Sequence, residues 1–248
     1  MHGQLPSNLD EKLVDIEQSY RWLKSGDIKG ETEGKIVAAQ DQVISTHYFK
    51  NKILKEEAEG KCRLCKQHEE NIDHLTLGCP ILGKNEYLMT HDKVCSHLHY
   101  SIYKALGIET TVKWYTHMPK PVYEKGDVTV LWNQAVHIDR EFTAKRSDIV
   151  IKITKVETCT LIDVAIPADR NVVPKEGSSY NIQVFMYRDR ANMEPEIYDH
   201  NSNYWIHWDS NEKLKEKFGK HSVDSILQTA ILGTSHIIRR YCSVKLES

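Results

Sequence analysis

The sequence predicts an α+β protein with an N-terminal helical segment, a small CCHC zinc knuckle, and a mixed β-sheet flanked by helices. Three observations lead to this expectation. Apolar residues recur at helical spacing near both ends of the chain. Three of the six cysteines crowd beside a histidine in one short polar segment. Two runs of β-branched and apolar residues stand close together in the second half of the chain.

Length and composition are those of an ordinary globular protein. The 248 residues leave room for one sizeable core or two small domains, and 40% of them are hydrophobic and 27% charged. No run comes near the roughly 20 apolar residues that span a bilayer. The first residues also lack the basic start and apolar stretch of a secretory signal, so we expect an intracellular chain with no membrane partner. The net charge of −2 neither supports nor excludes nucleic acid as a partner.

The region before the cysteines, residues 1–60, is expected to be helical. Residues 10–23 carry apolar side chains at intervals of three or four, a second helix is expected over residues 31–55, and Gly26 separates the two stretches. Gly60 ends this helical region. The inward-facing positions are expected to be Leu13, Ile16, Tyr20 and Leu23 in the first helix, and Ile36, Ala39, Val43 and Ile53 in the second.

Residues 61–84 are expected to form the zinc knuckle. The predicted ligands are Cys62, Cys65, His74 and Cys79, in a C-x2-C-x8-H-x4-C pattern. A C-x2-C turn presents two thiolates to one ion, and zinc takes four such ligands in a tetrahedron. The intervening loop is polar and has no apolar core of its own, so metal binding would supply the free energy that orders it. With four protein ligands the site is closed, and its role is expected to be structural.

Two alternatives to this ligand set remain open. His68 competes with His74 as the third ligand, although His74 leaves the more usual loop before Cys79. The three cysteines would otherwise be buried free thiols beside a surface histidine.

Residues 85–126 are expected to be a helical connector, and residues 127–248 a sheet domain. Apolar spacing predicts a helix over residues 87–106. Cys95, His97 and His99 are expected to be helix-packing and solvent-facing residues and not ligands of a second metal. Residues 113–127 contain three prolines or glycines and predict a loop. Residues 148–153 and 158–166 predict the two strands of a hairpin. Residues 180–209 show no sustained period, and residues 224–241 predict a closing helix that Gly233 interrupts.

Two aspartates flank the predicted hairpin. Asp148 opens its first strand, and Asp163 comes late in its second strand. In an antiparallel pair these positions lie side by side, so both carboxylates could reach one magnesium ion, which prefers hard oxygen ligands. Phosphodiester hydrolysis requires in addition a lysine that stabilises charge. This arrangement is the skeleton of the PD-(D/E)xK nucleases, although aspartates at strand ends are more often turn formers.

Seven segments resemble, in one order, the C-terminal region of non-LTR retrotransposon polyproteins, of the kind that carries a restriction-like endonuclease after the reverse transcriptase. They span most of the chain: MHGQ at Met1, WLKSGDIKGETEGKIVAAQDQ from Trp22, CRLC…H…C from Cys62, KWYTHMP at Lys113, RSDIVI at Arg146, LIDVAIPADRNV at Leu161 and LQTAILGTSHIIRR at Leu227. The aspartate-bearing polymerase motif of that family does not occur in this sequence, so the chain is not expected to polymerise DNA.

The resemblance implies a fold and a function. The sheet domain would be PD-(D/E)xK-like, with Asp148 and Asp163 as its two magnesium-binding acids, and the zinc knuckle would help to grip nucleic acid. The ancestral activity would be nicking of target DNA to prime reverse transcription. Its partners would be DNA and element RNA, and its location the nucleus.

Departures from the family pattern indicate that catalysis is impaired. Ser147 stands where the family has a proline before the first acid, and KEGSSYNIQVFMYRDR replaces the lysine-rich helix that follows the second acid. Lys175 matches the start of that helix, and either Lys175 or Arg188 could take the place of the catalytic lysine. The lysine positions of the family correspond here to Ser179 and Met186, or are lost in an insertion.

Three hypotheses follow from the sequence: a weakly active magnesium-dependent endonuclease, a non-catalytic nucleic-acid-binding remnant, and an unrelated zinc-stabilised interaction module. In the second, the phosphate contacts would come from Lys52, Lys55, Lys61, Arg63 and Lys66. Neighbouring glutamates nearly cancel that charge: Glu56, Glu57, Glu59, Glu69 and Glu70.

Overall fold

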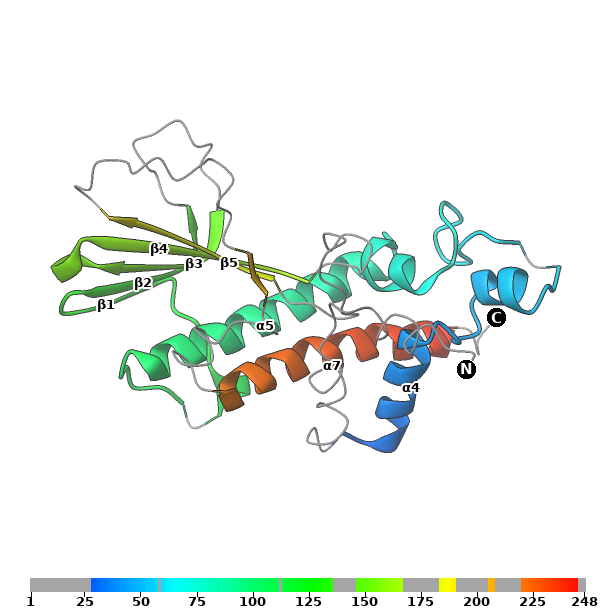
Figure 1. Ribbon diagram of the computed structural model, residues 1–248, viewed down its shortest axis with the longest axis horizontal. Coiled ribbons are helices and arrows are strands. Elements are labelled where there is room, and N and C mark those ends of the chain that lie inside the picture. The colour runs from blue at the N-terminus through cyan, green and yellow to red at the C-terminus, as the bar shows by residue number, and fades with distance from the viewer. Residues whose placement is uncertain are drawn as a thin grey trace. The chain divides into compact units, whose positions relative to one another are not determined.

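The computed structural model of the protein describes residues 28–57, 59–111, 113–135, 146–166, 183–190, 205–207 and 220–244. The architecture is α+β, and the chain forms two compact units (Figure 1). The first unit contains the described residues up to Asp92, Ile166, and those from Asp224 onward; the second contains the remainder. The helix predicted over residues 10–23 lies outside the described residues.

The first unit begins with helix α4 (Gly30–Gln40), which buries Ile36 and Ala39 as predicted. The expectation of one helix through residue 55 was wrong. The chain turns at Gln42, which has a left-handed φ of 54°, and a short π-helical segment, η1 (Phe49–Ile53), follows. Because this turn ends the helical periodicity, Val43 and Ile53 do not face inward and are 43% and 59% exposed.

Helix α7 (Lys220–Val244) runs without a break through Gly233, where the sequence predicted an interruption. Gly233 lies against Thr90 of helix α5 (Gly83–Ala105). A Cβ built on Gly233 would meet the Thr90 Cγ2 atom at 2.3 Å, so the glycine permits close helix packing. The buried positions of α7 include Ile226, Ala230, Ile231, Ile237, Ile238 and Tyr241.

The second unit is built on a six-stranded sheet in which each strand pairs with the next along the chain. The strands are β1 (Val122–Lys125), β2 (Val128–Ala135), β3 (Arg146–Ile153), β4 (Thr158–Ala165), β5 (Gln183–Arg190) and β6 (Trp205–His207). The predicted hairpin is present as β3 and β4, with Ile149 opposite Ile162 and Ile153 opposite Thr158. We expected a mixed sheet, but every pair among the described strands is antiparallel.

The second half of α5 packs on this sheet through aromatic rings. The ring of His99 meets Trp132 of β2 edge-on at 5.3 Å, and Tyr103 lies 5.0 Å from Tyr123 of β1. Cys95, His97 and His99 are all buried, so none of the three faces the solvent. Within the described part of the chain, every helix is too short or too polar to cross a lipid bilayer.

Candidate metal centre

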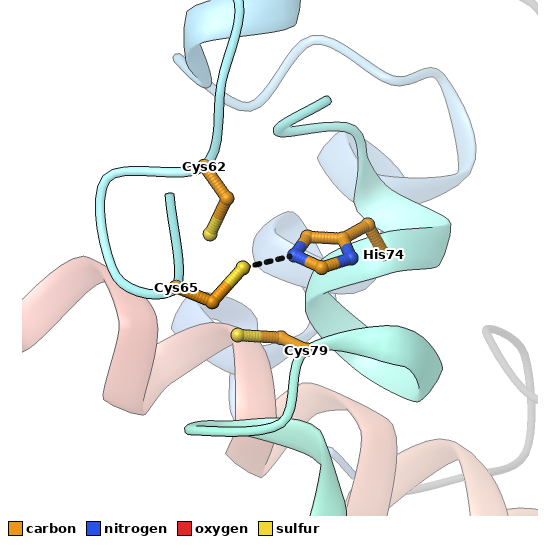
Figure 2. Close-up of side chains that lie close together, drawn as sticks. All are labelled: Cys62, Cys65, His74 and Cys79. Carbon is orange, nitrogen blue, oxygen red and sulfur yellow. Dashed lines mark hydrogen bonds between the residues drawn. The ribbon is translucent and has the colours of Figure 1, made fainter. Parts of the chain in front are cut away.

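The four predicted zinc ligands lie together. Cys62, Cys65, His74 and Cys79 each offer one ligand atom, and these atoms are all within 4.8 Å of one another (Figure 2). We call this group the CCHC cluster. The Cys65 Sγ atom lies 3.2 Å from the His74 Nε2 atom. Neighbouring ligand atoms of a tetrahedral zinc site with Zn–S of ~2.3 Å and Zn–N of ~2.0 Å are roughly 3.5–3.8 Å apart. The residues therefore fit a zinc ion after small side-chain adjustments.

Backbone hydrogen bonds shape the turn that carries the first two thiols. An isolated β-bridge pairs Lys61 with Glu69 and closes the base of the turn. Inside it, the Cys62 N–H donates to the His68 carbonyl at 2.7 Å, and the Lys66 N–H donates to the Cys62 carbonyl at 2.8 Å. Lys66 itself adopts a left-handed φ of 60°. The result is a tight loop from which both thiols point toward the same centre (Figure 2).

The other two ligands come from a single helical turn. His74 begins the π-helical segment η2 (His74–Gly78), and Cys79 follows it directly in extended conformation. The side chain of Asn71 caps this turn, because its Oδ1 atom accepts the His74 N–H at 2.8 Å. His68, the competing ligand, is exposed and lies outside the CCHC cluster. The geometry therefore selects His74.

The CCHC cluster is mostly shielded from water, since only Cys65 is partly exposed. Burial raises the pKa of the Cys62 thiol to about 11, so this thiol carries its proton at neutral pH unless a metal displaces it. At Cys65 burial acts in the same direction, but hydrogen bonds from the Gln67 and His68 amides outweigh it and lower the pKa. A bound zinc ion would favour the thiolate form of all three cysteines.

Glu70 organises the surroundings of the CCHC cluster, and sequence reasoning missed it. Its side chain is 0% exposed. Its carboxylate accepts hydrogen bonds from the Arg63 guanidinium at 2.6 Å, the Arg63 N–H at 2.7 Å, the His47 N–H at 2.8 Å and the Tyr241 O–H at 2.8 Å. Burial alone would raise the pKa of Glu70, but these hydrogen bonds prevail and hold it at about 2. The sequence offered no signal beyond a glutamate in a polar segment.

The role expected for Arg63 needs correction. We expected it to contact phosphate, but its side chain is only 16% exposed and is paired with Glu70. The exposed cations near the CCHC cluster are Lys52, Lys55, Lys61 and Lys66, and the exposed acids are Glu56, Glu57, Glu59 and Glu69. With lysines and glutamates equal in number, the surface around the cluster is close to neutral.

Helix α7 packs directly on the segment that carries the CCHC cluster. Ile237 and Tyr241 join Leu75 and Leu82 in one buried apolar group that also contains Cys62 and Cys79. The guanidinium of Arg63 lies over the Tyr241 ring, 5.2 Å from its centroid. The polar loop, which has no apolar core of its own, therefore shares a core with the C-terminal helix.

The predicted catalytic acids lie at one end of the β3–β4 hairpin. Asp148 and Asp163 are each one residue beyond the last pair, Ile149 opposite Ile162. The Asp148 Oδ2 atom accepts the N–H of Val164 at 2.8 Å. An Asp148 carboxylate oxygen also lies within 4.8 Å of the Cys95 Sγ atom.

The structure describes only part of the segment in which the catalytic lysine was expected. Lys175 and Ser179 lie outside the described residues. Met186 is on β5, opposite Ile162 of β4.

Comparisons with protein-family models, curated proteins and solved structures give no match to this chain.

Proposed function

We propose that the chain is a zinc-stabilised, nucleic-acid-binding and endonuclease-like fragment derived from a non-LTR retrotransposon. The observation that carries the zinc part is the CCHC cluster, whose four ligand atoms lie within 4.8 Å of one another. The retrotransposon origin and the PD-(D/E)xK-like fold rest on the seven segments of sequence resemblance. DNA and element RNA are the proposed partners, and the nucleus is the proposed location.

Zinc has a structural role in this proposal. When bound, it supplies strong bonds that tie the Cys62–Cys65 turn to the helical turn carrying His74 and Cys79. The four side chains fill its coordination shell, which leaves no position for substrate. Its effect on the chain is to fix the surface on which α7 packs.

Nucleic-acid binding is tested by fluorescence anisotropy with labelled single-stranded and duplex DNA over a series of salt concentrations. Contacts to phosphate predict affinity that falls linearly with salt on logarithmic axes. Cys79→Ser is expected to weaken binding by unfolding the knuckle, whereas the control Cys159→Ser changes a cysteine of β4 outside the CCHC cluster and is expected to bind normally. Binding that is insensitive to salt, or no binding, contradicts this part of the proposal and favours a protein-interaction module.

Magnesium-dependent nicking is the second candidate function. The observation that favours it is the hairpin, which places Asp148 and Asp163 at the same end of adjacent strands. In this mechanism both carboxylates would hold the cation and Lys175 would stabilise charge on the phosphate. Because the lysine-rich helix is replaced, we expect activity to be weak.

A plasmid-nicking assay with magnesium tests this candidate. Asp148→Ala and Asp163→Ala are expected to abolish nicking, while Asp127→Ala, in the exposed β1–β2 turn, is expected to retain it. Equal activity in all three variants would point to a contaminating nuclease. No nicking by the unmodified chain would leave binding as the only nucleic-acid function.

A further inference from the structure

The turn formed by residues 113–120 is held against α5 by two of its side chains. The indole of Trp114 stacks on the His97 ring with centroids 4.1 Å apart and planes 3° from parallel. The His117 Nε2 atom lies 2.8 Å from the His99 Nδ1 atom. Both partner histidines are buried in the second unit. We call these residues the 113–120 turn.

The side chains between and beyond these anchors face the solvent. Tyr115 is 62% exposed and Met118 is 83% exposed, although both are large and apolar in part. The Lys113 Nζ atom lies 5.5 Å from the centre of the Tyr115 ring, and Lys120 is exposed at the other end of the turn. The Tyr115 ring is therefore presented to the solvent with lysines beside it, and both ring and lysines are accessible to a partner.

The charged side chains nearest to Tyr115 along the chain are those of Lys113 and Lys120, and residues 113–120 contain no acidic residue. The exposed glutamates Glu109 and Glu124 lie outside this stretch, one on each side. Lysines therefore flank the Tyr115 ring directly, and this favours an anionic partner at the 113–120 turn.

We propose that the 113–120 turn is a contact for single-stranded nucleic acid, an inference that rests on the proposed nucleic-acid binding. A base stacks on the exposed ring of Tyr115, and Lys113 and Lys120 contact the flanking phosphates. An aromatic ring between cations accepts any base, because every base presents a π-face. Bases of a duplex are already stacked on one another, so the contact selects an unpaired strand.

The test measures binding of the full chain to a short fluorescein-labelled oligo(dT) and to a duplex of the same length. Tyr115→Ala is expected to weaken oligo(dT) binding about fivefold or more, and Tyr115→Phe to keep most of it, because stacking needs only the ring. Met89→Ala, which truncates an exposed methionine in the first unit, is the control and is expected to bind normally.

Salt dependence tests the lysines. Lys113→Gln and Lys120→Gln are each expected to lower the slope of log affinity against log salt by about 0.7, the value for one phosphate of a single strand. Lys155→Gln removes an exposed lysine from the β3–β4 turn and is expected to leave the slope unchanged. Photocrosslinking to a 5-bromouracil oligonucleotide is expected to modify the peptide that contains Tyr115.

The outcomes separate this inference from the function on which it rests. The inference is overturned if the unmodified chain binds, Tyr115→Ala binds as tightly, and the crosslinks fall on other peptides. The proposed nucleic-acid binding would then still stand. That result would assign the 113–120 turn to a protein partner. Equal weakening of duplex and single-strand binding by Tyr115→Ala contradicts the selection of an unpaired strand. No binding to any nucleic acid at low salt overturns both proposals.

Discussion

Tyr241 donates its phenolic O–H to the buried carboxylate of Glu70 at 2.8 Å, although 171 positions separate the two residues in the sequence. The Arg63 guanidinium bonds the same carboxylate and lies over the Tyr241 ring. The three side chains therefore join helix α7 to the loop that carries two of the CCHC ligands. We infer that the segment carrying the CCHC cluster and the C-terminal helix fold together.

Substitutions in this group should destabilise the first unit by different amounts. Tyr241→Phe keeps the ring and loses one hydrogen bond to a charged group, so the free energy of unfolding is expected to fall by about 1–3 kcal/mol. Glu70→Ala leaves the Arg63 guanidinium buried without its partner, and a loss of about 3–5 kcal/mol is expected. Urea unfolding followed by circular dichroism measures both losses.

The matched control for these variants is Ser243→Ala on the exposed side of α7. Its free energy of unfolding is expected to stay within about 0.5 kcal/mol of the unmodified chain. If Tyr241→Phe is as stable as this control, the hydrogen bond from Tyr241 to Glu70 does not stabilise the first unit.

Gly233→Ala tests the close approach of α7 to Thr90. Alanine normally stabilises a helix interior by about 1 kcal/mol relative to glycine. Here the added methyl would meet Thr90 at 2.3 Å, so we expect a net destabilisation of about 1–3 kcal/mol. Gly34→Ala in α4, where nothing lies within 4 Å of the added atom, is the control and is expected to be stabilising. Thr90→Ala combined with Gly233→Ala should recover part of the loss in a thermal melt.

The buried histidines of α5 predict that the second unit is sensitive to acid. Burial lowers the pKa of His97 to about 4, and burial with the nearby His117 lowers that of His99 to about 3. Both pKa values are below the ~6.5 of a histidine in an unfolded chain. At pH values between the folded and unfolded pKa, the unfolded chain therefore binds more protons than the folded chain. Stability is therefore fully present above pH ~6.5 and is lost as the pH falls toward 4, by on the order of 2 kcal/mol for each histidine at pH 5.

Tryptophan fluorescence during urea unfolding at neutral pH and at pH 5 measures this loss. His97→Phe keeps a ring against Trp114 and removes one titrating group, so a smaller pH dependence is expected. His68→Gln changes an exposed histidine and should leave the pH dependence as it is. Equal stability at both pH values would show that the burial of His97 and His99 does not govern the acid response.

Much of the CCHC cluster could be predicted from the sequence, because the spacing of metal ligands is a local property. The C-x2-C turn and the position of His74 before Cys79 are both short-range features, and the four side chains are found together. Glu70 could not be predicted, because two of its partners, His47 and Tyr241, are brought to it by tertiary packing. The same packing decides that Arg63 faces inward.

Helix and strand prediction succeeded where apolar residues form a clear local pattern. The β3–β4 hairpin was found from its apolar run, and the helices α5 and α7 from their period. Strand β1 was missed because its four residues are nearly all exposed and follow two prolines. Strand β5 was missed because QVFMYRDR does not alternate, and its partners on β4 lie far away in the sequence. Gly233 was read as a break because its packing against Thr90 is a tertiary feature.

Metal analysis by inductively coupled plasma mass spectrometry on the purified full chain tests the central claim most directly. About one zinc ion per chain is predicted, falling close to zero in Cys79→Ser and unchanged in Cys159→Ser, whose cysteine lies outside the CCHC cluster. Two results would contradict the assignment. One is a zinc content well below one ion per chain in protein purified and refolded with excess zinc, and the other is a zinc content in Cys79→Ser equal to that of the unmodified chain.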